Sequence, residues 1–386
     1  NGYGLFADAQ MPVRDMSYPK DFFLLYLRII AIVKKKLKIR FVQAILMEVP
    51  TKHKAAILRE FNKPLSIEYV QTPKPSGEGV LIKTLSAGIC HTDVHIWSGE
   101  RPQYKVPIVL GHEITGIVVA KGEMVPDNIK IGDKVLVYPW IPTEDDYYTV
   151  SGYTHLADNR SWLGFFLDGG YQEYVYVPHY KYLININDVE EPELTAPLSC
   201  AGLTSYRAVK KVLPYIKPGD YVAVIGLGGL GTYAVQWIKA LAPYVNLVGI
   251  DVKDEVYNFV NKITKIDYFI NPTREDPIKA AMNITNNKGF KAVLDFVNRK
   301  TVNIYTNTLS KLGIYVIVGL MDPEASISTF NIVYGERIIT GSLVGSLNDL
   351  IELMNLIRQG AINYKAVVTR KIQLEQASQA IHDFNT

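Results

Sequence analysis

The sequence predicts an α/β protein in two parts, a mostly β domain and a doubly wound parallel sheet that follows it. Short strand-like segments separated by glycine and proline fill residues 53–200. From residue 221 onward, continuous apolar runs alternate with helical patterns, which is typical of parallel βαβ units with helices on both faces. The length of 386 residues also favours two domains.

In the first part, short apolar runs between turn signals predict the strands. They are KAAIL (54–58), GVLIKTLSAG (79–88), GIVVAKG (116–122), DKVLVYPW (133–140) and EYVYVP (173–178). Their irregular spacing predicts a β domain without repeats.

In the second part, longer apolar runs predict the strands of a single sheet. They are YVAVIG (221–226), NLVGID (246–251), DYFIN (267–271), KAVLDFV (291–297), GIYVIVGL (313–320) and, as a sixth strand, IITGSLVG (338–345). The predicted helices are TYAVQWIKALA (232–242), DEVYNFVNKI (254–263), IKAAMNIT (278–285), TVNIYTNTLSKL (301–312), DLIELMNLIRQG (349–360) and LEQASQAIHDF (374–384). The last two helices should return to the first domain, so we expect one domain of residues 51–200 and 341–386, interrupted by a second domain of residues 201–340.

The two ends of the chain call for separate expectations. Residues 1–50 precede the first domain, and their apolar run, residues 22–33, is 12 residues long, short of the roughly 20 that span a bilayer. We expect a non-native extension before a folded chain that starts near Met47, with a membrane-surface anchor as the alternative.

At the other end of the chain, no predicted strand follows the last helix before Thr386, so we expect the sequence to be a fragment.

Composition excludes two classes of protein. The formal charge of +3, without a basic stripe, does not indicate nucleic-acid binding. Two cysteines cannot form a disulfide framework. A low cysteine content favours either a reducing compartment such as the cytoplasm or adaptation to heat.

A glycine-rich loop joins the first apolar strand of the second part to its helix. Gly226, Gly228 and Gly231 match G-x-G-x-x-G in the strand–helix context of a dinucleotide-binding Rossmann domain, with the helix N-terminus facing the phosphates. Asp251 ends the next strand, 20 residues after Gly231, where an acid binds the ribose hydroxyls and repels a 2′-phosphate. We therefore expect NAD rather than NADP, although Lys253 lies close by.

Both cysteines occur in the region that should face the cofactor. Cys90 stands in ICHTDVH, His112 follows 22 residues later, and Cys200 comes just before the doubly wound part. Two thiolates and one imidazole suit zinc, and three protein ligands leave one position open for chemistry. A buried, unreactive side chain is the alternative for either cysteine alone.

From about residue 53 to its end, the chain resembles the zinc-dependent medium-chain alcohol dehydrogenases, and it is most similar to their thermophilic archaeal members. The motifs that carry the resemblance are Cys90 with His95, the Gly111-His112-Glu113 triplet, Asp133 in a Gly-Asp-Lys-Val turn, Cys200 after Pro197-Leu198, and the glycine loop. The resemblance implies a GroES-like catalytic domain beside the Rossmann domain. It also implies reversible hydride transfer between a primary or secondary alcohol and NAD.

The resemblance assigns a metal site. Cys90, His112 and Cys200 would hold a catalytic zinc, which lowers the pKa of an alcohol. Glu113 would lie near the zinc and ligate it when substrate is absent. Asp93 would orient the imidazole of His112.

The resemblance also assigns a proton relay and a substrate pocket. Thr92 would accept the alcohol proton and pass it through the ribose hydroxyl of the cofactor to His95 and solvent. Trp140 and Trp162 would line an apolar pocket for a small alcohol or aldehyde, with Leu343 on its far side.

Further implications concern the nicotinamide ring and the assembly. Thr204 would pack beside the ring, and the backbones of Val318 and Leu343 would contact its amide. The family also implies a homodimer or homotetramer, joined through the strand IITGSLVG.

The chain departs from the family at a lobe that often binds a second, structural zinc through cysteines. This lobe should fall in residues 143–158, which contain no cysteine. The residues at its ligand positions are Thr143, Asp146, Thr149 and Ala157. Because hydroxyl and carboxylate oxygens cannot replace thiolates for zinc at comparable affinity, we expect a single zinc per chain. Packing of Tyr147, Tyr148 and Tyr153 is expected to stabilise the lobe instead.

Two alternatives stay open. A polyol, sugar or threonine-type dehydrogenase of the same superfamily is the first alternative. In the related polyol dehydrogenases the second acidic position of the triplet binds the metal and the late cysteine is absent, so Cys200 favours the alcohol branch. A metal-free nucleotide-binding relative is the second alternative, but it has no use for the relay residues Thr92 and His95.

Overall fold

The computed structural model describes residues 48–100 and 104–385. Contacts divide the chain into residues 1–50 and residues 51–386, and the fold described below is that of the second unit. The apolar run of residues 22–33 lies outside the described residues. No helix of the described segments is both long enough and apolar enough to cross a membrane.

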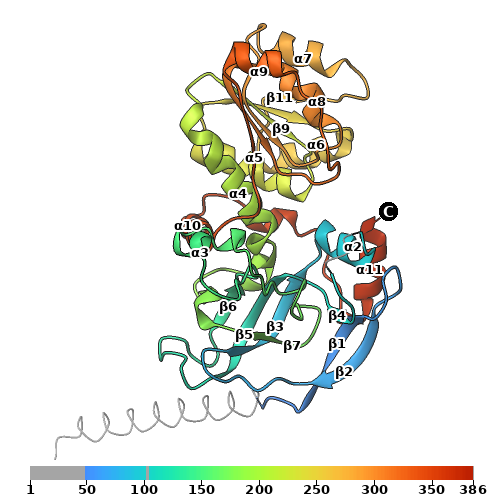
Figure 1. Cartoon of the computed structure of the whole chain (residues 1–386), viewed down its shortest axis with the longest axis vertical. Coiled ribbons are helices and arrows are strands. Elements are labelled where there is room, and N and C mark those ends of the chain that lie inside the picture. Colours follow the sequence, from blue (N-terminus) through green and yellow to red (C-terminus); the bar gives the residue numbers. More distant parts are fainter. Residues whose placement is uncertain (1–47, 101–103, 386) are drawn as a thin grey trace, which may run out of the picture. The chain divides into compact units, whose positions relative to one another are not determined.

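The first half of the unit forms two antiparallel sheets (Figure 1), as the short strand-like segments predict. One has the strand order β2–β1–β4 and the other the order β7–β3–β5–β6–β8. The strands are β1 (Lys52–Leu58), β2 (Ser66–Gln71), β3 (Val80–Gly88), β4 (Ile108–Val109), β5 (Glu113–Lys121), β6 (Lys134–Val137), β7 (Tyr174–Val177) and β8 (Leu183–Asn185). The helices in this half are α2 (His91–Trp97), α3 (Tyr147–Val150), η1 (Thr154–Leu156), η2 (Tyr180–Tyr182) and η3 (Pro192–Ser199).

The pairing of β3 with β5 positions two of the candidate metal ligands. Gly88, the last residue of β3, is the register partner of Glu113, the first residue of β5. Cys90 follows β3 at the N-cap of α2, and His112 directly precedes β5. One antiparallel ladder therefore brings together residues that are about twenty positions apart in the chain.

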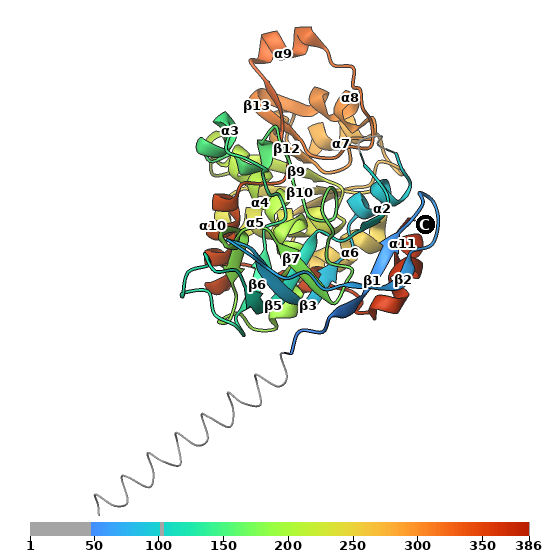
Figure 2. The ribbon, with the colours of Figure 1, turned by 60° about the horizontal axis from the view of Figure 1, so that its bottom comes forward.

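The second half contains six parallel strands in the order β11–β10–β9–β12–β13–β14, which is the doubly wound arrangement that the apolar runs predict. The strands are β9 (Tyr221–Ile225), β10 (Asn246–Ile250), β11 (Tyr268–Ile270), β12 (Phe290–Asp295), β13 (Leu309–Ile317) and β14 (Ile338–Gly341). The helices are α4 (Ala201–Val212), η4 (Leu213–Tyr215), α5 (Gly229–Leu241), α6 (Asp254–Ile263), α7 (Pro277–Ile284), α8 (Thr301–Tyr305), η5 (Thr306–Thr308) and α9 (Thr329–Gly335). Buried apolar clusters cover both faces of this sheet, so helices shield the strands on each side (Figure 2).

One predicted helix is wrong over its last third. The segment 301–312 has helical periodicity, but α8 ends at Tyr305 and strand β13 begins at Leu309. Leu309 pairs with Phe290 of β12, and the register between β12 and β13 shifts after this pair. This long-range pairing overrides the local pattern.

Two further helices follow β14. They are α10 (Leu347–Arg358) and α11 (Ala377–Asn385), with the short turns η6 (Tyr364–Val367) and η7 (Leu374–Gln376) between them. Helix α11 packs against α2 (Figures 1 and 2), where the rings of Phe384 and His91 are 4.8 Å apart.

Candidate active site

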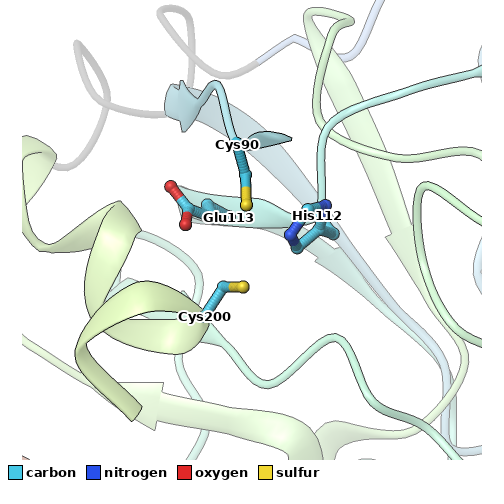
Figure 3. Close-up of side chains that lie close together, drawn as sticks. All are labelled: Cys90, His112, Glu113 and Cys200. Carbon is cyan, nitrogen blue, oxygen red and sulfur yellow. The ribbon is translucent and has the colours of Figure 1, made fainter. Parts of the chain in front are cut away.

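Four candidate metal ligands meet at the ends of β3, β5 and α4. One ligand atom each from Cys90, His112, Glu113 and Cys200 lies within 4.8 Å of all the others. Figure 3 shows the two thiols and the imidazole around a common space. Cys200 comes from the N-cap of α4, so residues from three separate segments form one cluster.

The donor set of this cluster fits zinc. Both ring nitrogens of His112 are buried, and no described residue forms a hydrogen bond with either of them. Buried polar atoms without a partner cost free energy, so such a pair indicates a missing ligand. Two thiols and an imidazole are the donors that zinc prefers, and a nearby carboxylate is compatible with them.

The electrostatics of the cluster also favour a cation. Burial raises the pKa of Glu113 to about 8. The contact between the two thiols lowers the pKa of Cys90 and raises that of Cys200. A bound metal ion would favour the thiolate form of both side chains, because a coordinated thiol loses its proton.

Asp93 connects both ligand-bearing segments. Its buried carboxylate accepts hydrogen bonds from the backbone N–H groups of Cys90 and Gly111, both at 3.0 Å, and from the hydroxyl of Tyr171 at 3.1 Å. The carboxylate also lies 3.4 Å from Nδ1 of His112, too poorly aligned for a hydrogen bond but close enough for electrostatic attraction. Asp93 therefore fixes the position of two candidate ligands at once.

Sequence reasoning did not identify Tyr171. The Tyr171 ring covers Gly111, which has φ +90°, and a Cβ atom at that glycine would lie 2.5 Å from the ring. The Tyr171 hydroxyl donates to Asp93 and lies 3.2 Å from the carbonyl oxygen of Gly88. No local motif could have revealed this contact, because Tyr171 is 60 or more residues away from its partners.

The proposed relay residues lie on α2 next to the cluster. Thr92 and His95 are three residues apart, and therefore on one face of the helix. The Thr92 hydroxyl is 3.8 Å from the sulfur of Cys90, whereas the side chain of His95 is 30% exposed. Nδ1 of His95 is 2.5 Å from Oε2 of Glu100, a partner that the sequence did not suggest. The helix thus presents a hydroxyl beside the cluster and an imidazole toward solvent.

An aromatic wall stands beside His112. The ring of Trp140 is 5.5 Å from the imidazole and 5.1 Å from the ring of Trp162. Sequence reasoning missed Phe165. Its ring packs against two of these rings, at 5.1 Å from His112 and 5.3 Å from Trp140. The indole N–H of Trp140 donates to the carbonyl of Ser199, which fixes one side of the wall.

The glycine loop has the geometry that pyrophosphate binding requires. Gly226 has φ +82°, and a Cβ atom at Gly231 would lie 1.9 Å from the Gly226 carbonyl oxygen, so neither position tolerates a side chain. The space beside Gly228, at the N-terminus of α5, is open. Asp251 accepts hydrogen bonds from the backbone N–H groups of Leu227 (2.8 Å) and Lys253 (3.0 Å), which anchors its carboxylate at the end of β10.

Of the three residues expected near the nicotinamide ring, one lies in the first turn of α4 and the other two follow strands β13 and β14. Thr204 is buried, and its hydroxyl donates to the Cys200 carbonyl at 2.6 Å. Val318 follows the end of β13 directly, and Leu343, which is 37% exposed, follows β14. Their assignment to the cofactor stays a prediction.

The cysteine-free lobe is held together by hydrogen bonds. The Asp146 carboxylate accepts from the backbone N–H groups of Thr149 and Asp158, both at 2.8 Å, and so connects two ends of the lobe. Tyr147 is 79% exposed, and its ring packs edge to face on that of Tyr148 with centroids 5.5 Å apart, so the stabilisation of the lobe by these tyrosines stays a prediction. The ring of Tyr153 contacts the ring of His155 at 6.4 Å and the guanidinium of Arg207 at 5.6 Å.

Comparisons with known proteins agree with this architecture. Residues 76–188 match the model of the alcohol dehydrogenase GroES-like domain, and residues 229–359 match that of zinc-binding dehydrogenases. The chain is 40% identical over 338 residues to an NAD-dependent alcohol dehydrogenase of Sulfurisphaera tokodaii, covering 85% of this chain and 95% of that protein. It is 32% identical over 334 residues to the D-arabinose 1-dehydrogenase (NADP+) of Saccharolobus solfataricus, covering 85% and 93%. The crystal structure of the alcohol dehydrogenase from Aeropyrum pernix superposes with a TM-score of 0.79, at 32% identity and over 86% and 96% of the two chains.

Proposed function

On the premise that this chain belongs to the zinc-binding alcohol dehydrogenase family, we propose that it catalyses reversible hydride transfer between a primary or secondary alcohol and NAD. The observation that carries the proposal is the cluster of Cys90, His112, Glu113 and Cys200. A buried imidazole without hydrogen-bond partners among the described residues, next to two thiols, is a metal-ligand set rather than a packing arrangement.

In the proposed mechanism, Cys90, His112 and Cys200 hold the zinc, with Glu113 beside it. When bound, zinc supplies a Lewis acid that lowers the pKa of an alcohol hydroxyl toward neutrality. Asp93 keeps two of these ligands in place through its contacts with Cys90, Gly111 and His112.

The residues of α2 move the proton. The Thr92 hydroxyl, 3.8 Å from the sulfur of Cys90, would accept the proton of the alcohol, and a ribose hydroxyl of bound NAD would link Thr92 to His95. His95 receives the proton near solvent, and Glu100 holds its imidazole at 2.5 Å.

The aromatic wall selects the substrate. Trp140, Trp162 and Phe165 pack edge to face beside His112, and they offer little hydrogen bonding to a polyol. An apolar wall of this kind favours aromatic or medium-chain alcohols over sugars. Asp251, anchored at the end of β10, favours NAD.

A sugar dehydrogenase is the second candidate, because one relative at 32% identity is a D-arabinose 1-dehydrogenase. NADH formation with ethanol, benzyl alcohol, sorbitol, threonine and D-arabinose separates the two functions. The alcohol assignment requires kcat/KM for benzyl alcohol to exceed that for D-arabinose, and the opposite order contradicts it.

The test of the metal site is zinc stoichiometry in the wild type and in Cys200→Ser. We expect one zinc per chain in the wild type and near zero in the variant. Fewer than about half a zinc in freshly purified wild type would overturn the catalytic proposal, because most chains would then lack the Lewis acid that the mechanism requires. Two zincs would contradict the single-site expectation for the lobe.

We also propose a homodimer or homotetramer in the cytoplasm. Two exposed features support the assembly. Strand β14 is an edge of the parallel sheet, and the nearby helix α9 exposes Phe330, Val333 and Tyr334 at 64%, 72% and 71%. A reducing compartment keeps the Cys90 and Cys200 thiols available for metal.

A further inference from the structure

The segment that follows β14, Ser342–Ser346, is held in a strained conformation. Val344 has φ +38°, in the left-handed region that β-branched residues avoid. Such a conformation persists only where the surroundings impose it, and it is concentrated at functional sites. The backbone N–H of Ser342 donates to the Ile317 carbonyl at 2.9 Å, so the segment begins beside the end of β13. We call Ser342–Ser346 the β14 loop.

A chain of hydrogen bonds from two distant side chains holds this loop. The hydroxyl of Tyr138 donates to the Gly345 carbonyl oxygen at 2.9 Å and lies 2.8 Å from the hydroxyl of Thr154. Since Tyr138 has one proton and gives it to Gly345, Thr154 must donate to Tyr138. The Thr154 oxygen in turn accepts from the backbone N–H of Leu347 at 3.1 Å. The two side chains therefore close a ring that begins at residue 345 and ends at residue 347.

Helix α4 also holds this end of the loop, through Asp349. Asp349 accepts from the backbone N–H and hydroxyl of Ser346, both at 2.9 Å. Arg207 and Lys210 of α4 donate to the same carboxylate at 2.6 and 2.9 Å. The loop is thus clamped from two directions, by α4 on one side and by Tyr138 and Thr154 on the other.

The two clamping side chains come from places with different roles. Tyr138 is completely buried and follows β6, two residues before Trp140 of the aromatic wall. Thr154 belongs to η1, inside the cysteine-free lobe. The hydrogen-bonded ring therefore connects that lobe to a loop at the carboxyl edge of the parallel sheet, which is where dinucleotides bind in this fold.

We propose that Tyr138 and Thr154 are positioning residues that hold the β14 loop in the conformation that receives the nicotinamide end of the cofactor. This inference rests on the proposed function, because it takes Leu343 to face the nicotinamide. It gives the lobe a role in cofactor binding that does not require a metal ion in the lobe.

The test compares the binding of NADH and of ADP-ribose, which lacks the nicotinamide ring, by fluorescence titration and calorimetry. In Tyr138→Phe and in Thr154→Val we expect the Kd for NADH to rise by roughly fivefold, the order expected for one neutral hydrogen bond. The Kd for ADP-ribose should stay unchanged in both. Thr154→Ser keeps the hydroxyl and should restore NADH binding, and the double variant should bind NADH no more weakly than either single variant.

Tyr182→Phe is the matched control, because Tyr182 is buried and stacks on Tyr138 with ring centroids 6.0 Å apart. It should leave both Kd values unchanged. Equal weakening of NADH and ADP-ribose in Tyr138→Phe, or no change in either, overturns the positioning role. If the wild type itself fails to bind NADH, it is the proposed function that fails. If Tyr138→Phe does not fold, the pair Thr154→Val and Thr154→Ser decides the outcome.

Discussion

At the scale of single residues, the candidate zinc site depends on groups that do not touch the metal. Asp93 accepts hydrogen bonds from both ligand-bearing segments, and Tyr171 donates to Asp93. Without the Tyr171 hydroxyl, one buried carboxylate oxygen would lose a donor, and Asp93 would be free to shift relative to His112. Partners of this kind typically change metal affinity by 10–100-fold.

We therefore predict that Tyr171→Phe binds zinc about tenfold more weakly while keeping the fold. The measurement is competition with a chromophoric chelator, which reports affinity without relying on activity. Tyr138→Phe is the control, because it also loses a buried tyrosine hydroxyl but contacts no candidate ligand, and its zinc affinity should match the wild type. Equal zinc loss in both variants would mean that the effect is a general loosening of the core.

The sequence predicted the ligands better than it predicted their supports. Cys90, His112 and Cys200 stand in motifs whose spacing and residue types already indicate zinc. Tyr171 and Phe165 carry no such local signal, because each reaches the site through contacts with residues more than fifty positions away. Physical support of a site is a property of tertiary packing, so local patterns do not reveal it.

At the scale of elements, apolar periodicity predicted the six parallel strands because strands buried on both faces leave continuous apolar runs. It failed at the start of β13, where Leu309 is buried but the next three residues are partly or fully exposed. Ser310 and Lys311 belong to the strand only because Leu309 pairs with Phe290. Helices and strands could be predicted where burial determines the pattern of apolar residues. They could not be predicted where only the pairing with a neighbouring strand determines the structure.

The contact between α4 and α10 leads to a prediction about pH. Burial alone would raise the pKa of Asp349, but the hydrogen bonds from Lys210 and Ser346, together with Arg207, lower it to about 2. The ordinary value is near 4, so the folded state favours the charged form. The stabilisation is complete above pH about 4, is lost as pH falls toward 2, and amounts to about 2 kcal/mol.

Accordingly, Asp349→Asn should lower the free energy of unfolding at pH 7 by about 2 kcal/mol, and the difference from the wild type should shrink between pH 4 and 2. Urea unfolding at a series of pH values measures it. Glu352→Gln is the matched control, since Glu352 also pairs with Lys210 but is half-exposed, and its loss should be below about 1 kcal/mol. A difference that grows as pH falls would contradict the assigned direction of the pKa shift.

At the scale of the whole molecule, each half carries a different part of the proposed active site. The antiparallel sheets carry Cys90 and His112 on one ladder, and the parallel sheet carries the glycine loop and Asp251 at the carboxyl ends of its strands. Helix α4 joins them, since its N-cap is Cys200 and its last two turns bind Asp349. The proposed hydride transfer would need both halves, because the candidate metal ligands Cys90 and His112 lie on one and the glycine loop on the other.

The exposed edge of the molecule gives the last prediction. The edge strand β14 pairs with β13, and helix α9, which exposes Phe330, Val333 and Tyr334, packs against β13 as well. A second copy related by a two-fold axis would cover both features with the same surface on each partner. Replacing Val333 with aspartate would place a charge in that interface without touching the core, because Val333 is 72% exposed in the single chain. We therefore expect Val333→Asp to reduce the mass measured by light scattering toward that of one chain.

Tyr69→Asp is the control for this experiment, because Tyr69 on β2 is comparably exposed, at 66%, and lies on a different sheet. It should leave the mass unchanged. Dissociation in Val333→Asp alone supports an interface through α9 and β14, since the added charge is the same in both variants and only its location differs. An unchanged multimer in Val333→Asp would show that the chains associate through another surface, and a monomeric wild type would show that β14 and α9 stay exposed in solution.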